Sequence, residues 1–141
     1  MASEARLYTI TDDTKEKLRK FRLGTSRINE PQAVIYLIDK QTKEIRQDED
    51  EVLYKTLEDI ADDLPENSPR FVLLSYPMIT SDGRQKVPYV MFFYMPQNCN
   101  AAQRMLYAGA KELMRNTSEV TKIVDLESAE DLEEVPTLLA D

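Results

Sequence analysis

Two nearly uninterrupted apolar runs constrain the fold of this chain most. Residues 70–76 (RFVLLSY) and 89–95 (YVMFFYM) are rich in β-branched and aromatic side chains. Runs of this kind are typical of strands that are covered on both faces. The Asp82-Gly83 pair between them is a hairpin signal, but the link from Pro77 to Pro88 is longer than a tight turn. We therefore expect two buried strands joined by a projecting loop.

The flanking segments predict further elements. Apolar residues recur at helical spacing in residues 14–22 and 57–64, and residues 33–38 (AVIYLI) form another buried run. The polar segment 44–47 is a weak strand, expected at a sheet edge. After residue 96 the pattern predicts a long helix, a short strand and an acidic terminal helix that Pro136 is placed to interrupt, over residues 101–115, 122–126 and 129–139.

This order of elements predicts a single α/β (α+β) domain with a central mixed five-stranded sheet flanked by helices. The long helix joins the last two strands, so we expect them to be parallel and linked by a right-handed crossover. With 141 residues the chain is long enough for one core. We expect the domain to span residues 1–141, with its core from about 5 to 135.

The composition argues against catalysis. The chain has no histidine, three glycines and one cysteine, which excludes imidazole-based catalysis and metal ligation and any glycine-rich nucleotide loop. A remaining enzyme hypothesis would use Cys99, whose thiol precedes the long helix, but no base accompanies it. We therefore expect a protein-binding module that needs no cofactor or metal.

Charge and hydropathy restrict the classes of partner and the cellular compartment that we expect for this chain. The net charge of −8 argues against nucleic acid and anionic membranes as partners, and no window approaches the roughly 20 apolar residues of a membrane span. The N-terminus has no apolar secretory signal, and a single cysteine fits a reducing compartment. We expect a cytoplasmic monomer. Ser3, in a loose tail, is a candidate for phosphorylation.

The long helix has two faces of different chemistry. We expect Ala102, Leu106, Ala110 and Leu113 to pack on the sheet, because they recur at helical spacing. A second face carries Met105, Ala108, Gly109 and Glu112, with Arg104 beside it. A glycine within a helix costs about 1 kcal/mol relative to alanine. Two explanations stay open for Gly109: close packing of helix on sheet, or an outward face kept shallow for a partner.

The first helix is basic. Its cations, among them Lys20 and Arg22, are placed to steer an acidic partner, although an ordinary solvated helix face is the alternative. The run Asp48-Glu49-Asp50-Glu51 lacks the glycine and the ligand spacing of a calcium loop, so we interpret it as surface.

Several motifs occur in one order: KLRKFR, PRFVLLSYP, a DGR loop, and MLYAGAK with TK shortly after. Together they resemble the glia maturation factor branch of the actin-depolymerising-factor homology (cofilin-like) family, over about residues 11–132. The resemblance implies binding to the actin-related protein two/three (Arp two/three) complex, inhibition of branched nucleation and dissociation of daughter filaments. It also implies a location on the cytoplasmic actin cytoskeleton, including cortical actin patches, and in the nucleus.

The resemblance implies two binding surfaces. The first, which meets an actin-like protomer of the complex, would comprise Lys20, Arg22, Arg104, Met105, Ala108, Gly109 and Glu112. The second, which would meet actin of the daughter filament at a branch junction, would comprise Asp82, Arg84, Lys86, Glu130, Asp131 and Glu134. The chain departs from cofilin-type members at Ala102, where they carry a second lysine, and in its ending, EEVPTLLAD. A cofilin-like protein that binds and severs actin directly is the alternative.

Overall fold

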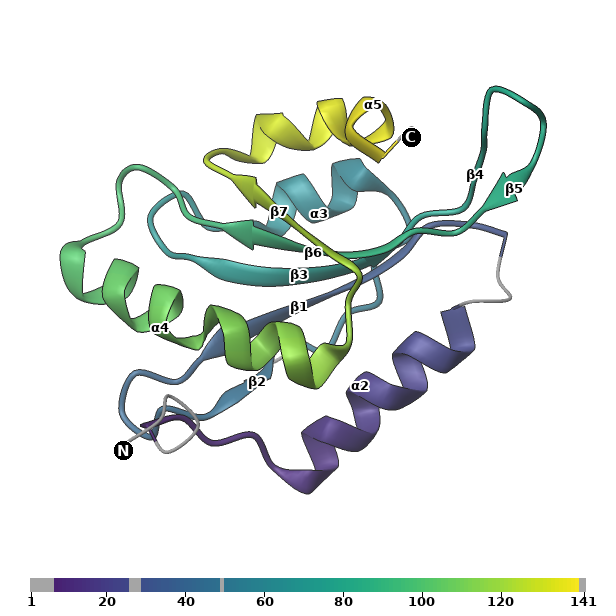
Figure 1. Cartoon of the computed structure of the whole chain (residues 1–141). Helices are drawn as coiled ribbons and strands as arrows, with labels where there is room; N and C mark the ends of the chain where they lie inside the picture. Colours follow the sequence, from purple (N-terminus) through teal and green to yellow (C-terminus); the bar gives the residue numbers. More distant parts are fainter. Residues whose placement is uncertain (1–6, 26–28, 49, 140–141) are drawn as a thin grey trace.

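The computed structural model describes residues 7–25, 29–48 and 50–139 (Figure 1). Ser3 lies outside these residues. The elements follow one another as α2 (Asp12–Thr25), β1 (Gln32–Ile38), β2 (Ile45–Gln47), α3 (Leu57–Asp63), β3 (Arg70–Ser75), β4 (Met78–Ile79), β5 (Gln85–Lys86), β6 (Tyr89–Tyr94), α4 (Ala101–Ser118), β7 (Lys122–Leu126), the 3₁₀ helix η1 (Ala129–Glu134) and α5 (Val135–Leu139).

The central sheet has five strands in the order β2-β1-β3-β6-β7. Neighbouring strands are antiparallel except β6 and β7, which are parallel, with Phe92 opposite Val124. In the centre Phe71 pairs with Phe93. The predicted fold class, a mixed five-stranded sheet flanked by helices in one domain, is confirmed, as is the edge position of β2.

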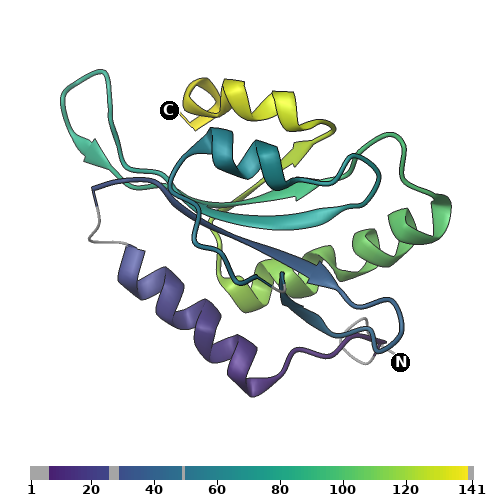
Figure 2. The same ribbon diagram turned by 180° about the vertical axis from the view of Figure 1, so that it is seen from behind.

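Helices cover both faces of the sheet, which explains why its central strands are apolar throughout (Figures 1 and 2). On one face Phe71 and Met91 lie in a core with residues of α2 and α4. On the other face Val72 and Phe92 lie in a second core with residues of α3, η1 and α5. All four side chains are fully buried. Burial of side chains of this size stabilises the fold by about 1.5–3 kcal/mol each.

Side-chain caps set where the helices begin. The amide of Thr14 donates to the Thr11 hydroxyl at 3.1 Å, so α2 starts two residues before the predicted position. The amide of Gln103 donates to Asn100 Oδ1 at 2.8 Å, so Asn100 caps the long helix. α4 continues to Ser118, beyond the predicted end, and stops where Glu119 adopts a left-handed conformation.

The buried stripe of α4 differs from the predicted one. Ala110 is buried as expected and Leu106 and Leu113 are half-buried, but Ala102 is exposed, so the prediction was wrong there. The fully covered stripe is formed by Gln103, Tyr107, Ala110, Met114 and Ser118. Tyr107 determines this rotation, because its ring packs 5.4 Å from that of Phe71 and its hydroxyl accepts the Ile38 amide at 2.9 Å.

The C-terminal segment is divided. We expected one acidic helix over residues 129–139, interrupted at Pro136, and the structure has a 3₁₀ helix up to Glu134 followed by the short α5. Proline has no amide hydrogen, and its ring clashes with the carbonyl four residues earlier in an α-helix. Because Pro136 is the second residue of α5, its position needs no amide donor, and no residue of the same α-helix lies four positions before it.

Candidate protein-interaction surfaces

One face of α4 is open to solvent and carries an exposed apolar side chain near the N-terminal end of the helix. Met105 is 75% exposed, the highest value among the exposed large hydrophobic residues. Ala108 and Glu112 are exposed beside it. A methionine is flexible and polarisable and adapts to irregular partner surfaces. The structure thus gives this face an anchor that fills no part of the core.

Arg104 is exposed, but its guanidinium group has intramolecular partners. It donates to the carbonyl oxygens of Pro96 and Gln97 at 3.1 and 2.9 Å. These residues belong to the connection between β6 and α4. Arg104 therefore holds this connection against the first turn of α4, a structural role that its sequence position did not reveal.

Gly109 is explained by a contact that neither sequence-based explanation included. Tyr8 crosses α4 and donates its hydroxyl to the Leu106 carbonyl at 2.7 Å. A Cβ atom at position 109 would lie 2.5 Å from the Tyr8 hydroxyl oxygen. The glycine allows the N-terminal segment to approach the helix, and Gly109 is half-buried as a result. The sequence contains no signal for this pair, because Tyr8 and Leu106 are 98 residues apart.

The α2 helix lies beside α4 on the same face of the sheet (Figure 1). Lys20 is exposed, and no ion pair involves it in the described part of the chain. Arg22 is half-buried and pairs with Glu119 at 3.2 Å. The predicted residues of the first surface thus come from two adjacent helices, but Lys20 is the more available cation.

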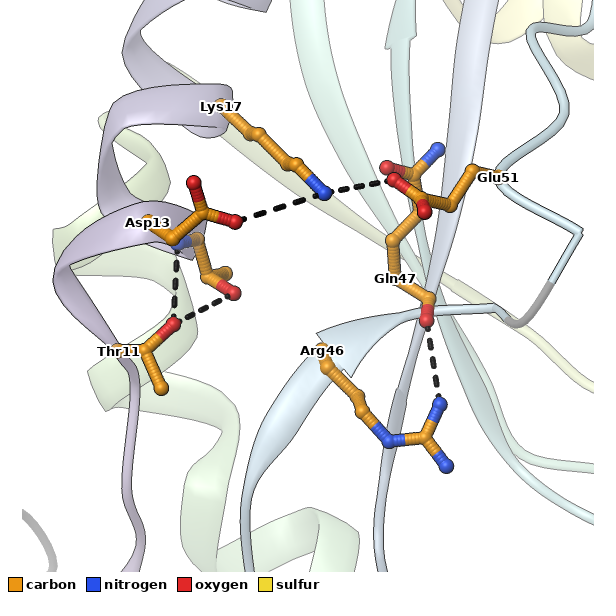
Figure 3. A network of polar contacts seen from close by, with 7 residues as sticks. Thr11, Asp13, Lys17, Arg46, Gln47 and Glu51 are labelled. Atoms are coloured by element: carbon orange, nitrogen blue, oxygen red, sulfur yellow. Dashed lines mark hydrogen bonds and ion pairs between the residues drawn. The ribbon is translucent and has the colours of Figure 1, made fainter.

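Another lysine of α2 serves the fold. Figure 3 shows Lys17 reaching across to Glu51 at 2.6 Å, with Asp13 at 3.6 Å. The hydrogen bond to Glu51 is the main reason that the pKa of Lys17 is raised. This pair connects α2 to the segment that follows β2. Within β2 itself, Arg46 donates to the Gln47 carbonyl at 3.5 Å. Lys17 is therefore engaged within the fold, and only other cations of α2 are left for a partner.

The predicted loop between β3 and β6 forms a ribbon of two short strands, β4 and β5, which projects from the sheet (Figure 1). At its tip the Thr80 hydroxyl hydrogen-bonds Asp82, and Arg84 Nε pairs with the same carboxylate at 3.1 Å. The hydrogen bond from Thr80 is the main cause of a lowered pKa at Asp82. Gly83 has φ of 87°, which favours glycine. Asp82 and Arg84 are exposed on an ordered turn.

The other residues predicted for the second surface play different parts. Lys86 donates to the Leu139 carbonyl at 3.3 Å and so joins the ribbon to the end of α5. Glu130 and Glu134 are exposed on η1. The carboxylate of Asp131 instead accepts the amides of Glu127 and Ser128 at 3.0 and 3.3 Å and caps η1. Lys86 has a partner that is distant along the chain, whereas the Ser128–Asp131 capping box is a local pattern that our sequence-based prediction did not include.

Neither a metal site nor a membrane span emerges from the described residues. In residues 7–25, 29–48 and 50–139, no three cysteine or acidic side chains are placed to hold a metal ion. In the same ranges, no helix is long and apolar enough to cross a membrane.

The fold is an α/β domain that exposes one face of α4 and the projecting β4–β5 ribbon. Residues 7–138 match the family model described as cofilin/tropomyosin-type actin-binding protein. The chain is 38% identical over 125 residues to glia maturation factor beta of Rattus norvegicus, covering 89% of this chain and 86% of that protein. It is 37% identical over 139 residues to Protein AIM7 of Saccharomyces cerevisiae, covering 92% and 93%.

A solved structure agrees with these relatives. The solution structure of glia maturation factor from Caenorhabditis elegans matches with a TM-score of 0.76 and 30% identity, covering 92% of this chain and 94% of that one. The chain belongs to the actin-depolymerising-factor homology (cofilin-like) family and, within it, to the glia maturation factor branch. It is thus a member of an actin-regulatory family.

Proposed function

We propose that this protein binds the Arp two/three complex, inhibits branched actin nucleation and promotes the release of daughter filaments. The observation that carries the proposal is the exposed Met105 of α4, set in a chain 38% identical to a glia maturation factor. It acts as a cytoplasmic binding protein without a cofactor, as a monomer on the actin cytoskeleton, including cortical patches, and in the nucleus. The domain spans residues 1–141.

The first surface uses the open face of α4 together with α2. Burial of an exposed methionine against a partner contributes up to about 1.5–3 kcal/mol, which is tenfold or more in affinity. The small residue Ala108 keeps the face shallow beside Met105, whereas Gly109 is covered by Tyr8. Lys20, which has no ion pair among the described residues, supplies a cation that attracts an acidic partner. Glu112 lies on the rim of the same face.

The second surface consists of the β4–β5 ribbon together with η1. A single helix face can engage one actin-like protomer, so release of a daughter filament requires a contact elsewhere on the domain. Asp82 and Arg84 are exposed on a projecting ribbon, and Glu130 and Glu134 are exposed on η1, on the sheet face opposite α4. Actin of the daughter filament is the partner of this surface.

A pair of binding measurements tests the proposal. The protein should bind purified Arp two/three complex, and it should remain in the supernatant when unbranched actin filaments are sedimented. Ala102 is exposed at the position where filament-binding members carry lysine, so this chain has one cation fewer for filaments. The family description names actin-binding proteins, which supports the alternative of direct actin binding. Co-sedimentation with unbranched filaments, without binding to the complex, would establish that alternative.

A further inference from the structure

A groove of about 480 Å³ lies between the β1–β2 turn and the first two turns of α4. Its apolar lining comes from α4 and consists of Ala102, Met105 and Leu106. Lys40 and Lys43 of the turn stand on the opposite side, and no carboxylate lines the groove. We call this feature the lysine-rimmed groove. Its chemistry is apolar on one side and cationic on the other.

The two ammonium groups have no counter-ion within the described residues. Lys43 adopts a left-handed conformation with φ of 63°, and its Nζ donates to the Lys40 carbonyl at 2.7 Å. This hydrogen bond holds the Lys43 ammonium at the rim and leaves two of its three donors available. The cation is therefore already positioned, which lowers the entropy lost when a partner binds.

One segment of backbone holds both walls of the groove in place. The Thr9 amide donates to the Lys43 carbonyl at 3.0 Å, and the Ile45 amide donates to the Thr9 carbonyl at 2.8 Å. The neighbouring Tyr8 hydroxyl bonds the Leu106 carbonyl on α4. The β1–β2 turn and α4 are thus tied to each other through two consecutive residues. The groove is a preformed feature of the fold.

We propose that the lysine-rimmed groove binds a segment of the partner in which an apolar side chain is flanked by carboxylates. The apolar side chain would lie against Met105 and Leu106, and the carboxylates would pair with Lys40 and Lys43. Charge complementarity favours this occupant, because the groove has two unpaired cations and no acid. The inference rests on the proposed function, since the segment belongs to the Arp two/three complex, and it extends the first surface to the β1–β2 turn.

The test compares two charge reversals that change the net charge equally. Lys40→Glu alters the groove. Lys55→Glu is the control, because Lys55 is exposed and lies far from the groove: its neighbour Tyr54 forms a β-bridge with Ala33, near the opposite end of β1. The affinity of each variant for the complex is measured at low and at high salt. We expect Lys40→Glu to weaken binding about fivefold or more at low salt, and less at high salt. Lys55→Glu and Lys40→Arg should stay within about twofold of the unmodified protein.

A direct readout identifies the partner group. Carbodiimide cross-linking joins a lysine amine to a contacting carboxylate as an amide, so mass spectrometry of the treated complex should find Lys40 or Lys43 linked to an acidic segment. Equal effects of Lys40→Glu and Lys55→Glu, or the absence of such a link, would overturn the inference while leaving the proposed function intact. If the unmodified protein does not bind the complex at all, the proposed function itself fails.

Other occupants give different results. A second copy of this chain would appear as a dimer in sedimentation analysis that Lys40→Glu dissociates. An anionic membrane would appear as binding to phosphatidylserine vesicles that Lys40→Glu abolishes while affinity for the complex is unchanged. Either result would replace the acidic segment as the occupant.

Discussion

The hydroxyl group of Tyr8 lies in the space that a side chain at Gly109 would need, since a Cβ there would be 2.5 Å from the hydroxyl oxygen but 3.6 Å from Cζ of the ring. Only the oxygen is too close. The glycine at position 109 therefore makes room for one hydrogen bond, which the Tyr8 hydroxyl donates to the Leu106 carbonyl. This relationship predicts whether a substitution at Gly109 raises or lowers the stability of the protein.

Gly109→Ala should destabilise the protein by about 1 kcal/mol, because the lost Tyr8 hydrogen bond and the displaced ring outweigh the gain in helix propensity. In a Tyr8→Phe background the same substitution should be neutral or stabilising by up to about 1 kcal/mol, because the obstructing oxygen is gone. Urea unfolding of the four proteins measures this coupling. Gly24→Ala, where a Cβ meets nothing within 4 Å, is the control and should not destabilise. Additive effects of the two substitutions would disprove the close contact.

Met105→Ala should lower affinity for the Arp two/three complex at least tenfold and leave the free energy of unfolding unchanged, because the side chain is 75% exposed. Met114→Ala on the same helix is the matched control. Met114 is fully buried, so its loss should cost about 2–5 kcal/mol of stability. Arg104→Ala should also weaken binding, and part of that effect should come from the loosened β6–α4 connection. Faster hydrogen exchange of the Cys99 amide, which donates to the Pro96 carbonyl, would show this loosening. Full affinity of the Met105 variant would remove this face from the binding site.

Lys20→Ala should weaken association with the complex without changing stability, and the loss should shrink as salt rises, because exposed charges are screened within about 10 Å at 0.1 M salt. Arg22→Ala, in contrast, should lower the free energy of unfolding, by less than about 1 kcal/mol, because it removes the ion pair with Glu119. Binding measured at several salt concentrations, together with thermal unfolding, separates the two. A salt-independent loss at Lys20 would contradict the electrostatic role.

Asp82→Ala combined with Arg84→Ala should keep most of the affinity for the complex but slow branch dissociation seen by single-filament microscopy. The two residues pair with each other at the exposed tip of the ribbon and contribute nothing to the core. Lys86→Ala tests the support of the ribbon separately, because it removes the bond to the Leu139 carbonyl. Debranching at the unmodified rate by the double variant would reduce the ribbon to an ordinary connection.

The Asp82 carboxyl group should titrate below its ordinary pKa of 3.8, chiefly because the Thr80 hydroxyl donates to the ionised form. Since the folded pKa is the lower one, the carboxylate stabilises the ribbon above the unfolded pKa, and this contribution disappears as pH falls through the folded pKa. Carboxyl-carbon NMR measures the midpoint. Thr80→Val should raise it, whereas Thr80→Ser should preserve it; a midpoint unchanged by Thr80→Val would exclude the hydroxyl as the cause.

Much of the fold follows from local patterns. The apolar runs of β1, β3 and β6 predict central strands because they have no polar face, and both sheet faces are indeed covered. The Asn100 cap and the position of β7 are equally local, because a cap depends on residues three apart and a strand on its own side chains. The exposed position of Met105 follows from helical spacing.

The site depended on contacts that no local pattern encodes. The packing of Tyr107 on Phe71 fixes the orientation of α4 about its own axis, and in this orientation Ala102 is exposed. Tyr8 and Lys86 obtained their roles from backbone groups that only the folded chain brings close. The sequence by itself therefore determined the five strands of the central sheet, the long helix and its exposed Met105, because periodicity and capping act over a few residues. Only the tertiary structure decided which cations are unpaired and which residues hold the surfaces together, because those partners lie far apart along the chain.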